Sequence, residues 1–150
     1  MSERRGRIDF AVGKPGEGIQ LLVEAKNTNA PTRDWASRFL RNLFAHTEIP
    51  RSEYFLLALR DHLYLWLHPE REPKDPDYEI DTAAALRPYL GEVKGSLEKL
   101  SESSFELVML AWLNDLVAGT LPDAETRHWV ESSGLAKAVR NSSIRTNLAA

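Results

Sequence analysis

The chain has 150 residues, of which 43% are hydrophobic and 27% are charged, and its formal net charge is −3. This composition is close to the globular average and excludes wholesale disorder, collagen-like repeats and a coiled-coil rod. The sequence contains no cysteine, which excludes disulfides, thiolate metal sites and cysteine nucleophiles together.

The distribution of charge and hydropathy bears on partners and location. Residues 1–66 contain ten Lys/Arg against eight Asp/Glu, and residues 67–150 contain nine against fourteen. Because no basic footprint covers the whole chain, any site for a polyanion must be local. No apolar run approaches the roughly 18 to 20 residues that cross a bilayer, and no secretory signal follows the N-terminal charges. We therefore expect a cytoplasmic protein without a membrane partner.

The first predicted element is a β-hairpin. Apolar residues recur at every second position of residues 7–13, the period of a half-buried strand. A second strand is predicted over residues 19–27. Residues 14–18 lie between them and contain a Pro-Gly pair and a second glycine, which favour a tight turn.

An amphipathic helix is predicted next, over residues 33–46, with Thr32 as its N-cap. Residues 54–59 are continuously apolar, as in a strand covered on both faces. Residues 63–67 alternate again and complete a second hairpin. Residues 1–67 are therefore expected to form a β-β-α-β-β core.

The second half has a different pattern. Residues 68–82 contain three prolines and many charges, which predicts an exposed, partly extended connector. Residues 83–150 are expected to form a helical tail that packs on the same domain. Its predicted elements are helices near 83–90, 93–100, 104–118, Trp129 and 135–139, and a closing strand at 144–148. The predicted fold class is α/β, a mixed β-sheet with flanking helices plus a C-terminal helical segment.

The sharpest group of polar residues is Asp9 with Glu24 and Lys26. Glu24 and Lys26 are two apart in a strand, so both project to one face. If the hairpin pairs Gly13 with Gln20, Asp9 lies opposite Glu24, where Cβ atoms are about 4.5 to 5.5 Å apart. Two carboxylates and an ammonium would then share one small volume.

Two interpretations of this group remain open. Opposed carboxylates repel unless a cation compensates them. Mg²⁺ fits, because it prefers oxygen ligands and is typically held by one or two carboxylates. The alternative is structural: Glu24 pairs with Lys26 on the surface, and Asp9 is unrelated to them.

The motif resembles a known family. Asp9 on one strand, then Glu24-Ala25-Lys26 after Leu21-Leu22-Val23, followed by a helix and an apolar strand, resembles the PD-(D/E)XK nuclease superfamily. The resemblance extends to bacterial members with a helical tail and implies a restriction endonuclease-like core. It further implies Mg²⁺-dependent hydrolysis of phosphodiester bonds in nucleic acid, most plausibly DNA, with Mn²⁺ as a substitute. Asp9 and Glu24 would be the metal ligands and Lys26 the catalytic lysine.

This chain departs from the superfamily at its start. The superfamily core usually begins with a helix and a strand, whereas only eight residues precede Asp9. The chain could be a fragment, take those elements from another protomer, or be a catalytically inactive nuclease-fold module for nucleic-acid or protein binding. An uncovered edge on the first strand would invite pairing with another chain, so we expect a homodimer or a partner chain that completes the sheet edge.

Two further pairs of residues are candidates for nucleic-acid contact. Arg38 and Arg41 lie on the predicted helix, off its apolar stripe, where they either contact phosphates or form a solvated face. Tyr64 and Trp66 either stack on bases or cover the sheet.

Overall fold

The computed structural model describes residues 7–26, 28–29, 32–91 and 96–149. Its strands are β1 (Arg7–Gly13), β2 (Ile19–Ala25), β3 (Tyr54–Ala58), β4 (His62–Leu67), β5 (Tyr78–Asp81) and β6 (Ser143–Ala149). Its helices are α1 (Arg33–His46), α2 (Thr82–Leu86) with a 3₁₀ turn at Arg87–Tyr89, α3 (Ser96–Lys99), α4 (Glu102–Ala118), α5 (Ala124–Ser132) and α6 (Leu135–Val139).

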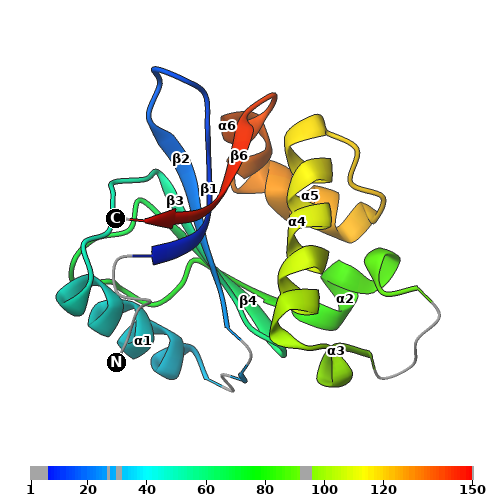
Figure 1. The fold of residues 1–150 in the computed structure, drawn as a ribbon, viewed down its shortest axis with the longest axis horizontal. Coiled ribbons are helices and arrows are strands. Elements are labelled where there is room, and N and C mark those ends of the chain that lie inside the picture. The colour runs from blue at the N-terminus through cyan, green and yellow to red at the C-terminus, as the bar shows by residue number, and fades with distance from the viewer. Residues whose placement is uncertain (1–6, 27, 30–31, 92–95, 150) are drawn as a thin grey trace.

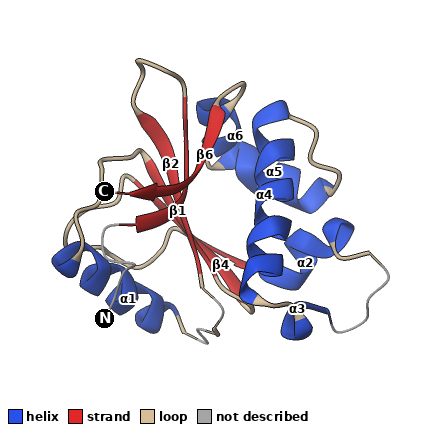
Figure 2. Cartoon of the chain, viewed as in Figure 1, coloured by secondary structure: helices blue, strands red, loops and turns tan. Residues whose placement is uncertain are grey.

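The strands form one six-stranded mixed sheet in the order β5-β4-β3-β2-β1-β6. β2 and β3 are parallel, because α1 carries the chain back to the starting end of β2, as a parallel pair requires. The other neighbours are antiparallel. α1 lies on one side of the sheet and the later helices lie on the other (Figures 1 and 2). The predicted α/β class, a mixed sheet with flanking helices, is confirmed.

The sheet has an apolar core on each face. In β3, Phe55 and Leu57 pack on the α1 side with Leu40 of the helix. Leu56 and Ala58 of the same strand pack on the opposite side. A strand buried on both faces has no polar alternation, which is why residues 54–59 are continuously apolar.

The larger core lies under the later helices. Helix α4 buries Phe105, Met109, Trp112 and Leu116 along one side. Trp112 stacks on Trp129 of α5 with ring centroids 5.9 Å apart. Gly119 takes the left-handed conformation at φ 76°, and its amide caps the carbonyls of Asp115 and Leu116. This glycine therefore ends α4 where the sequence predicts.

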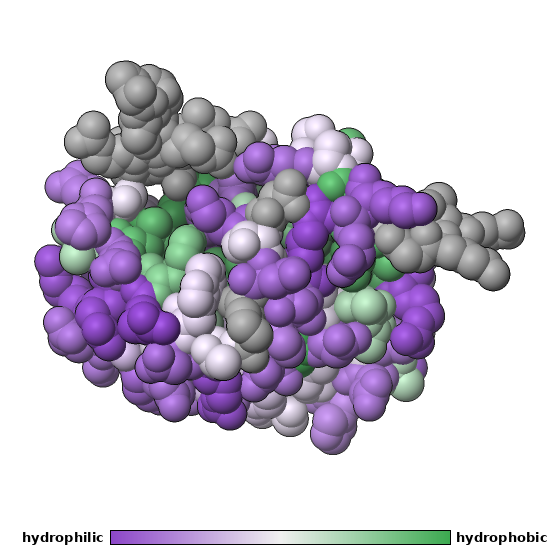
Figure 3. Space-filling model, turned by 90° about the horizontal axis from the view of Figure 1, so that it is seen from below, coloured by the Kyte–Doolittle hydropathy of each residue, from purple (hydrophilic) through white to green (hydrophobic). Residues whose placement is uncertain are grey.

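One face of the molecule is shown in Figure 3. Most of it is hydrophilic, and apolar residues appear in separate areas toward its left and right sides. Within the described ranges, no helix combines the length and the apolar character needed to span a bilayer.

Residues 68–82 are mostly exposed and partly extended, and they also contain an edge strand of the sheet. β5 pairs with β4, and Thr82 already belongs to α2. Pro73 and Pro76 are buried, and the indole N–H of Trp66 donates to the Lys74 carbonyl at 2.8 Å. The segment is held against the sheet because its backbone carbonyls accept hydrogen bonds from side chains of the core.

The predicted open edge on β1 is also absent. β6 pairs with β1 in an antiparallel ladder that includes Phe10 opposite Thr146 and Ala11 opposite Arg145. Residues 83–150 therefore supply an edge strand as well as helices, and the sheet is not confined to residues 1–67. The covered edge removes the sequence argument for a homodimer or a partner chain at β1.

The first hairpin contains an irregularity that the sequence does not reveal. Gly13 lies opposite Ile19, not Gln20, because the ladder shifts between Val12 and Gly13. A Cβ atom on Gly13 would be 2.5 Å from the Gly18 carbonyl oxygen. The close approach of the two strands here therefore requires glycine.

Gly134 gives a test of the packing between α6 and the sheet. It has φ 84°, and an added Cβ would lie 2.8 Å from the Tyr54 hydroxyl, which donates to the Ser133 carbonyl at 3.0 Å. Gly134→Ala should lower the free energy of unfolding by about 1 to 2 kcal/mol from backbone strain. Displacement of the Tyr54 hydrogen bond should add about 0.5 to 1.5 kcal/mol.

Gly16→Ala is the matched control for this prediction. Gly16 has φ 80°, and an added Cβ would meet nothing within 4 Å, so this variant reports backbone strain alone. Urea unfolding of both variants measures the difference, and equal losses would show that Tyr54 does not constrain position 134.

Candidate functional site

Asp9 lies near the start of β1 and is directed at β2. Its carboxylate Oδ2 accepts a hydrogen bond from the backbone N–H of Ala25 at 2.8 Å. The predicted register of the hairpin is present at Phe10 opposite Val23 and at Ala11 opposite Leu22. The structure therefore brings Asp9 to the strand that carries Glu24.

Glu24 lies on the α1 side of the sheet, because side chains alternate and its neighbour at the same parity, Leu22, packs in the core beneath α1. Asp9 and Glu24 are each only 6% exposed. Buried carboxylates need hydrogen bonds, opposite charges or a metal ion to remain ionised. Two such groups on neighbouring strands are unusual in a sheet that is otherwise apolar.

Lys26 projects to the same face as Glu24. Its backbone N–H donates to the Ala58 carbonyl at 2.9 Å, which continues the pairing of β2 with β3. Its ammonium lies over the ring of Phe39 of α1, 5.8 Å from the centroid. The side chain is thus at the margin of the α1 core, partly exposed, and in cation–π contact.

The donor chemistry of Asp9 and Glu24 fits a hard divalent cation. Carboxylate oxygens are the protein ligands that Mg²⁺ prefers, and Mg²⁺ commonly takes only one or two of them and keeps several waters. No group of three or more His, Cys, Asp or Glu side chains arranged to hold a metal occurs among the residues that the structure describes. Among the described residues, the site therefore offers two carboxylates to a cation.

Arg38 and Arg41 lie on the exposed side of α1, away from the sheet. Arg38 forms a salt bridge with Asp34 at 3.1 Å, and Arg41 lies 3.9 Å from Glu72. All four side chains are at least about half exposed. Because exposed pairs of this kind contribute about 0 to 1 kcal/mol, a phosphate could displace either carboxylate.

Tyr64 and Trp66 cover the sheet and are not available for stacking on bases. Both are almost fully buried under α1. Burial, followed by the charges of Glu79 and Asp61, raises the pKa of the Tyr64 hydroxyl to about 12. The phenol is therefore neutral at physiological pH.

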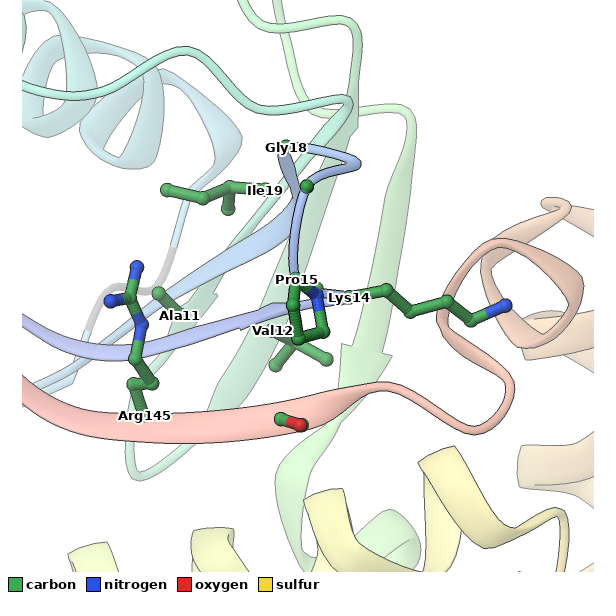
Figure 4. Close-up of a pocket in the computed structure, with 10 residues that line it drawn as sticks. Ala11, Val12, Lys14, Pro15, Gly18, Ile19 and Arg145 are labelled. Atoms are coloured by element: carbon green, nitrogen blue, oxygen red, sulfur yellow. The ribbon is translucent and has the colours of Figure 1, made fainter.

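The structure also presents a cation that the sequence analysis did not single out. A cavity of about 430 Å³ lies between the β1–β2 hairpin and β6, and Arg145 of β6 lines it. In Figure 4 the Arg145 side chain rises from β6 beside Ala11, while Lys14 extends away from it. The alternation of Ile144 and Arg145 in a closing strand was the available signal, but the partner strand was needed to place it.

Comparisons with protein-family models, with curated proteins and with solved structures find no match to this chain.

The burial of Tyr64 predicts a loss of stability at alkaline pH. Its pKa is raised to about 12 in the folded state, so between about pH 10 and that value the unfolded chain loses the proton and the folded chain keeps it. The free energy of unfolding should then fall by up to about 1.4 kcal/mol per pH unit. Tyr64→Phe lacks this proton, so its stability should fall less steeply from pH 9 to 11 in urea titrations. Parallel curves for the two proteins would contradict the assignment.

Proposed function

We propose that this chain is a Mg²⁺-dependent nuclease of the PD-(D/E)XK type that hydrolyses phosphodiester bonds in DNA. The observation that supports the proposal most strongly is the contact of the Asp9 carboxylate with the amide of Ala25, which directly follows Glu24. It brings two buried acids to adjacent strands, and Lys26 follows on the face of Glu24. The order acid, then Glu-x-Lys, then helix and parallel strand is the arrangement that the sequence resemblance implies.

Asp9 and Glu24 would hold the metal ion. When bound, Mg²⁺ polarises the phosphodiester and lowers the pKa of a water ligand. The Ala25 N–H fixes the orientation of the Asp9 carboxylate, so the ligand is arranged before substrate arrives. The buried setting strengthens each electrostatic interaction, because less water screens it.

Lys26 would orient the attacking water or stabilise the charge that develops on the phosphate. Its ammonium must leave the Phe39 ring, 5.8 Å away, to do so. A cation–π contact at a partly exposed site contributes about 0.5 to 1 kcal/mol, so moving the ammonium away from the ring loses only this small free energy. Arg38 and Arg41 would contact flanking phosphates from the exposed side of α1, and we propose a cytoplasmic location with nucleic acid as the partner.

A second candidate function is a non-catalytic module that keeps the fold and binds nucleic acid or protein. The observation that favours it is the same contact of Lys26 with Phe39. A lysine whose role is to cover an aromatic ring needs no substrate. The two candidates differ in whether the unmodified chain cleaves DNA.

The role of Asp9 and Glu24 as metal ligands can be tested by removing their charges. Asp9→Asn keeps an oxygen that can accept the Ala25 N–H, and Glu24→Gln keeps the shape of its side chain, so both variants should fold. Each removes one charged ligand and should weaken Mn²⁺ binding about tenfold or more. Calorimetric titration with Mn²⁺ measures binding, and a plasmid-nicking assay with Mg²⁺ should show loss of cleavage in both variants.

The control for the acids is Glu125→Gln. Glu125 is an exposed carboxylate in the first turn of α5, on the opposite side of the sheet from the site. It should bind Mn²⁺ and nick plasmid as the unmodified chain does. Unchanged Mn²⁺ binding in Asp9→Asn and Glu24→Gln would exclude the proposed metal site.

The role of Lys26 in cleavage can be distinguished from the role of the acids in metal binding. Lys26→Ala removes a positive charge near the proposed ion, so Mn²⁺ affinity should be retained or increased while nicking is lost. Phe39→Leu is the matched variant, because it removes the ring beneath the ammonium and keeps the lysine; it should retain nicking. Near-normal nicking by Lys26→Ala would exclude the catalytic role of Lys26. No nicking by the unmodified chain would favour the non-catalytic module, in which both variants only lower stability, by about 1 kcal/mol for the cation–π contact.

A further inference from the structure

The cavity beside the first hairpin has features of a binding site. It measures about 430 Å³ and is formed where β1, the hairpin turn and β6 meet, a size within the range of small-ligand pockets. Ala11, Pro15 and Ile19 supply apolar walls, and Arg145 supplies a cation. Figure 4 shows that the Arg145 side chain stands beside Ala11, on the side where Ile19 also lies.

Arg145 differs from other arginines of the chain in its partners. Arg38 is engaged by a carboxylate, Arg33 donates to the Pro76 carbonyl at 2.6 Å, and Arg127 donates to the Leu121 carbonyl at 2.8 Å. Arg145 is exposed, and no carboxylate in the described part of the chain lies within 4.0 Å of it. Its guanidinium can therefore bind an external anion without first breaking an ion pair with those residues.

The register places Arg145 next to the candidate metal site. Arg145 lies directly opposite Ala11. Asp9 precedes Ala11 by two residues on β1. Diagonal neighbours of this kind on an antiparallel pair are about 7 to 8 Å apart, which is within the reach of an arginine side chain. The lining of the cavity runs from Ala11 through the hairpin turn to Ile19 and includes neither Asp9 nor Glu24, so Arg145 would connect a ligand in the cavity with the acids.

We propose that Arg145 binds a backbone phosphate of the nucleic-acid strand, so that the cavity holds a nucleotide that flanks the cleavage site. This proposal rests on the proposed function. Guanidinium groups bind phosphate through paired N–H donors, and the apolar walls suit the sugar that the phosphate carries. Arg145 is a positioning residue in this scheme, because it fixes the strand and does not touch the reacting atoms.

The test measures how strongly binding depends on salt. A fluorescein-labelled oligonucleotide, single-stranded and duplex, is titrated with the full chain by anisotropy, with Ca²⁺ in place of Mg²⁺ to prevent cleavage. A lost phosphate contact reduces the slope of log K against log salt by about 0.7 for single strands and 0.9 for duplex. Arg145→Ala should show this reduction. Arg145→Lys should keep the slope, because it keeps the charge, but bind more weakly than the unmodified chain.

Lys99→Ala is the matched control. Lys99 carries the same charge and is exposed in the last turn of α3, on the side of the sheet opposite α1 (Figure 1). Its loss should leave the slope unchanged. Equal slope changes in Lys99→Ala and Arg145→Ala would overturn the proposal, since the effect would then follow total charge, and so would an unchanged slope in Arg145→Ala.

Nicking by the unmodified chain separates this proposal from the proposed function. If the unmodified chain nicks plasmid but Arg145→Ala leaves the salt slope of binding unchanged, the phosphate contact is overturned and the nuclease proposal stands. An Arg145-dependent slope without nicking would support the contact and refute the nuclease. A chain that neither binds the oligonucleotide nor nicks plasmid would overturn both.

Discussion

The position of β2 in the middle of the sheet fixes the geometry of everything around it. β2 is hydrogen-bonded to β1 on one side and to β3 on the other, and its residues from Leu21 to Ala25 are buried. A strand that is apolar on both faces specifies its own register weakly, because a slip of one residue exchanges one apolar face for the other. Glu24 and Lys26 break this degeneracy. A slip would move both charges beneath the later helices, into the core that contains Trp112.

Asp9 and Glu24 are charged residues in an otherwise uncharged set of buried residues within the described ranges. The rest of that set is almost entirely apolar or hydroxyl-bearing. Apolar side chains at these positions would avoid the cost of removing carboxylates from water. Natural sequences violate local stability rules mainly where function requires it. The hydrogen bond from Ala25 to Asp9 stabilises one of these acids in the place where it would act.

Local patterns in the sequence predict most of the elements and the grouping of Asp9 with Glu24. Both follow from short-range rules, namely period two in strands and the symmetry of a hairpin about its turn. The shift at Gly13 follows from a close backbone approach that has no sequence signature beyond glycine itself. β6 was harder, because its partner β1 is distant in the sequence. β5 pairs with the preceding strand β4, but it follows a segment rich in proline and charge, whose composition favours a connector. Arg145 can be identified as a candidate phosphate-binding residue only when β6 is known to pair with β1. No local sequence pattern predicts that pairing.

The pairing of β6 with β1 has a consequence for the order of folding. The β1–β2 hairpin can form early, since its contacts are local, whereas Phe10 meets Thr146 only after the long segment between them has been synthesised. Contacts between distant segments form slowly because the closure of a long loop must come first. During synthesis the outer edge of β1 is therefore exposed and able to pair with another nascent chain. The acid-bearing hairpin would acquire its second neighbour, and the cavity its arginine, only when β6 pairs with β1.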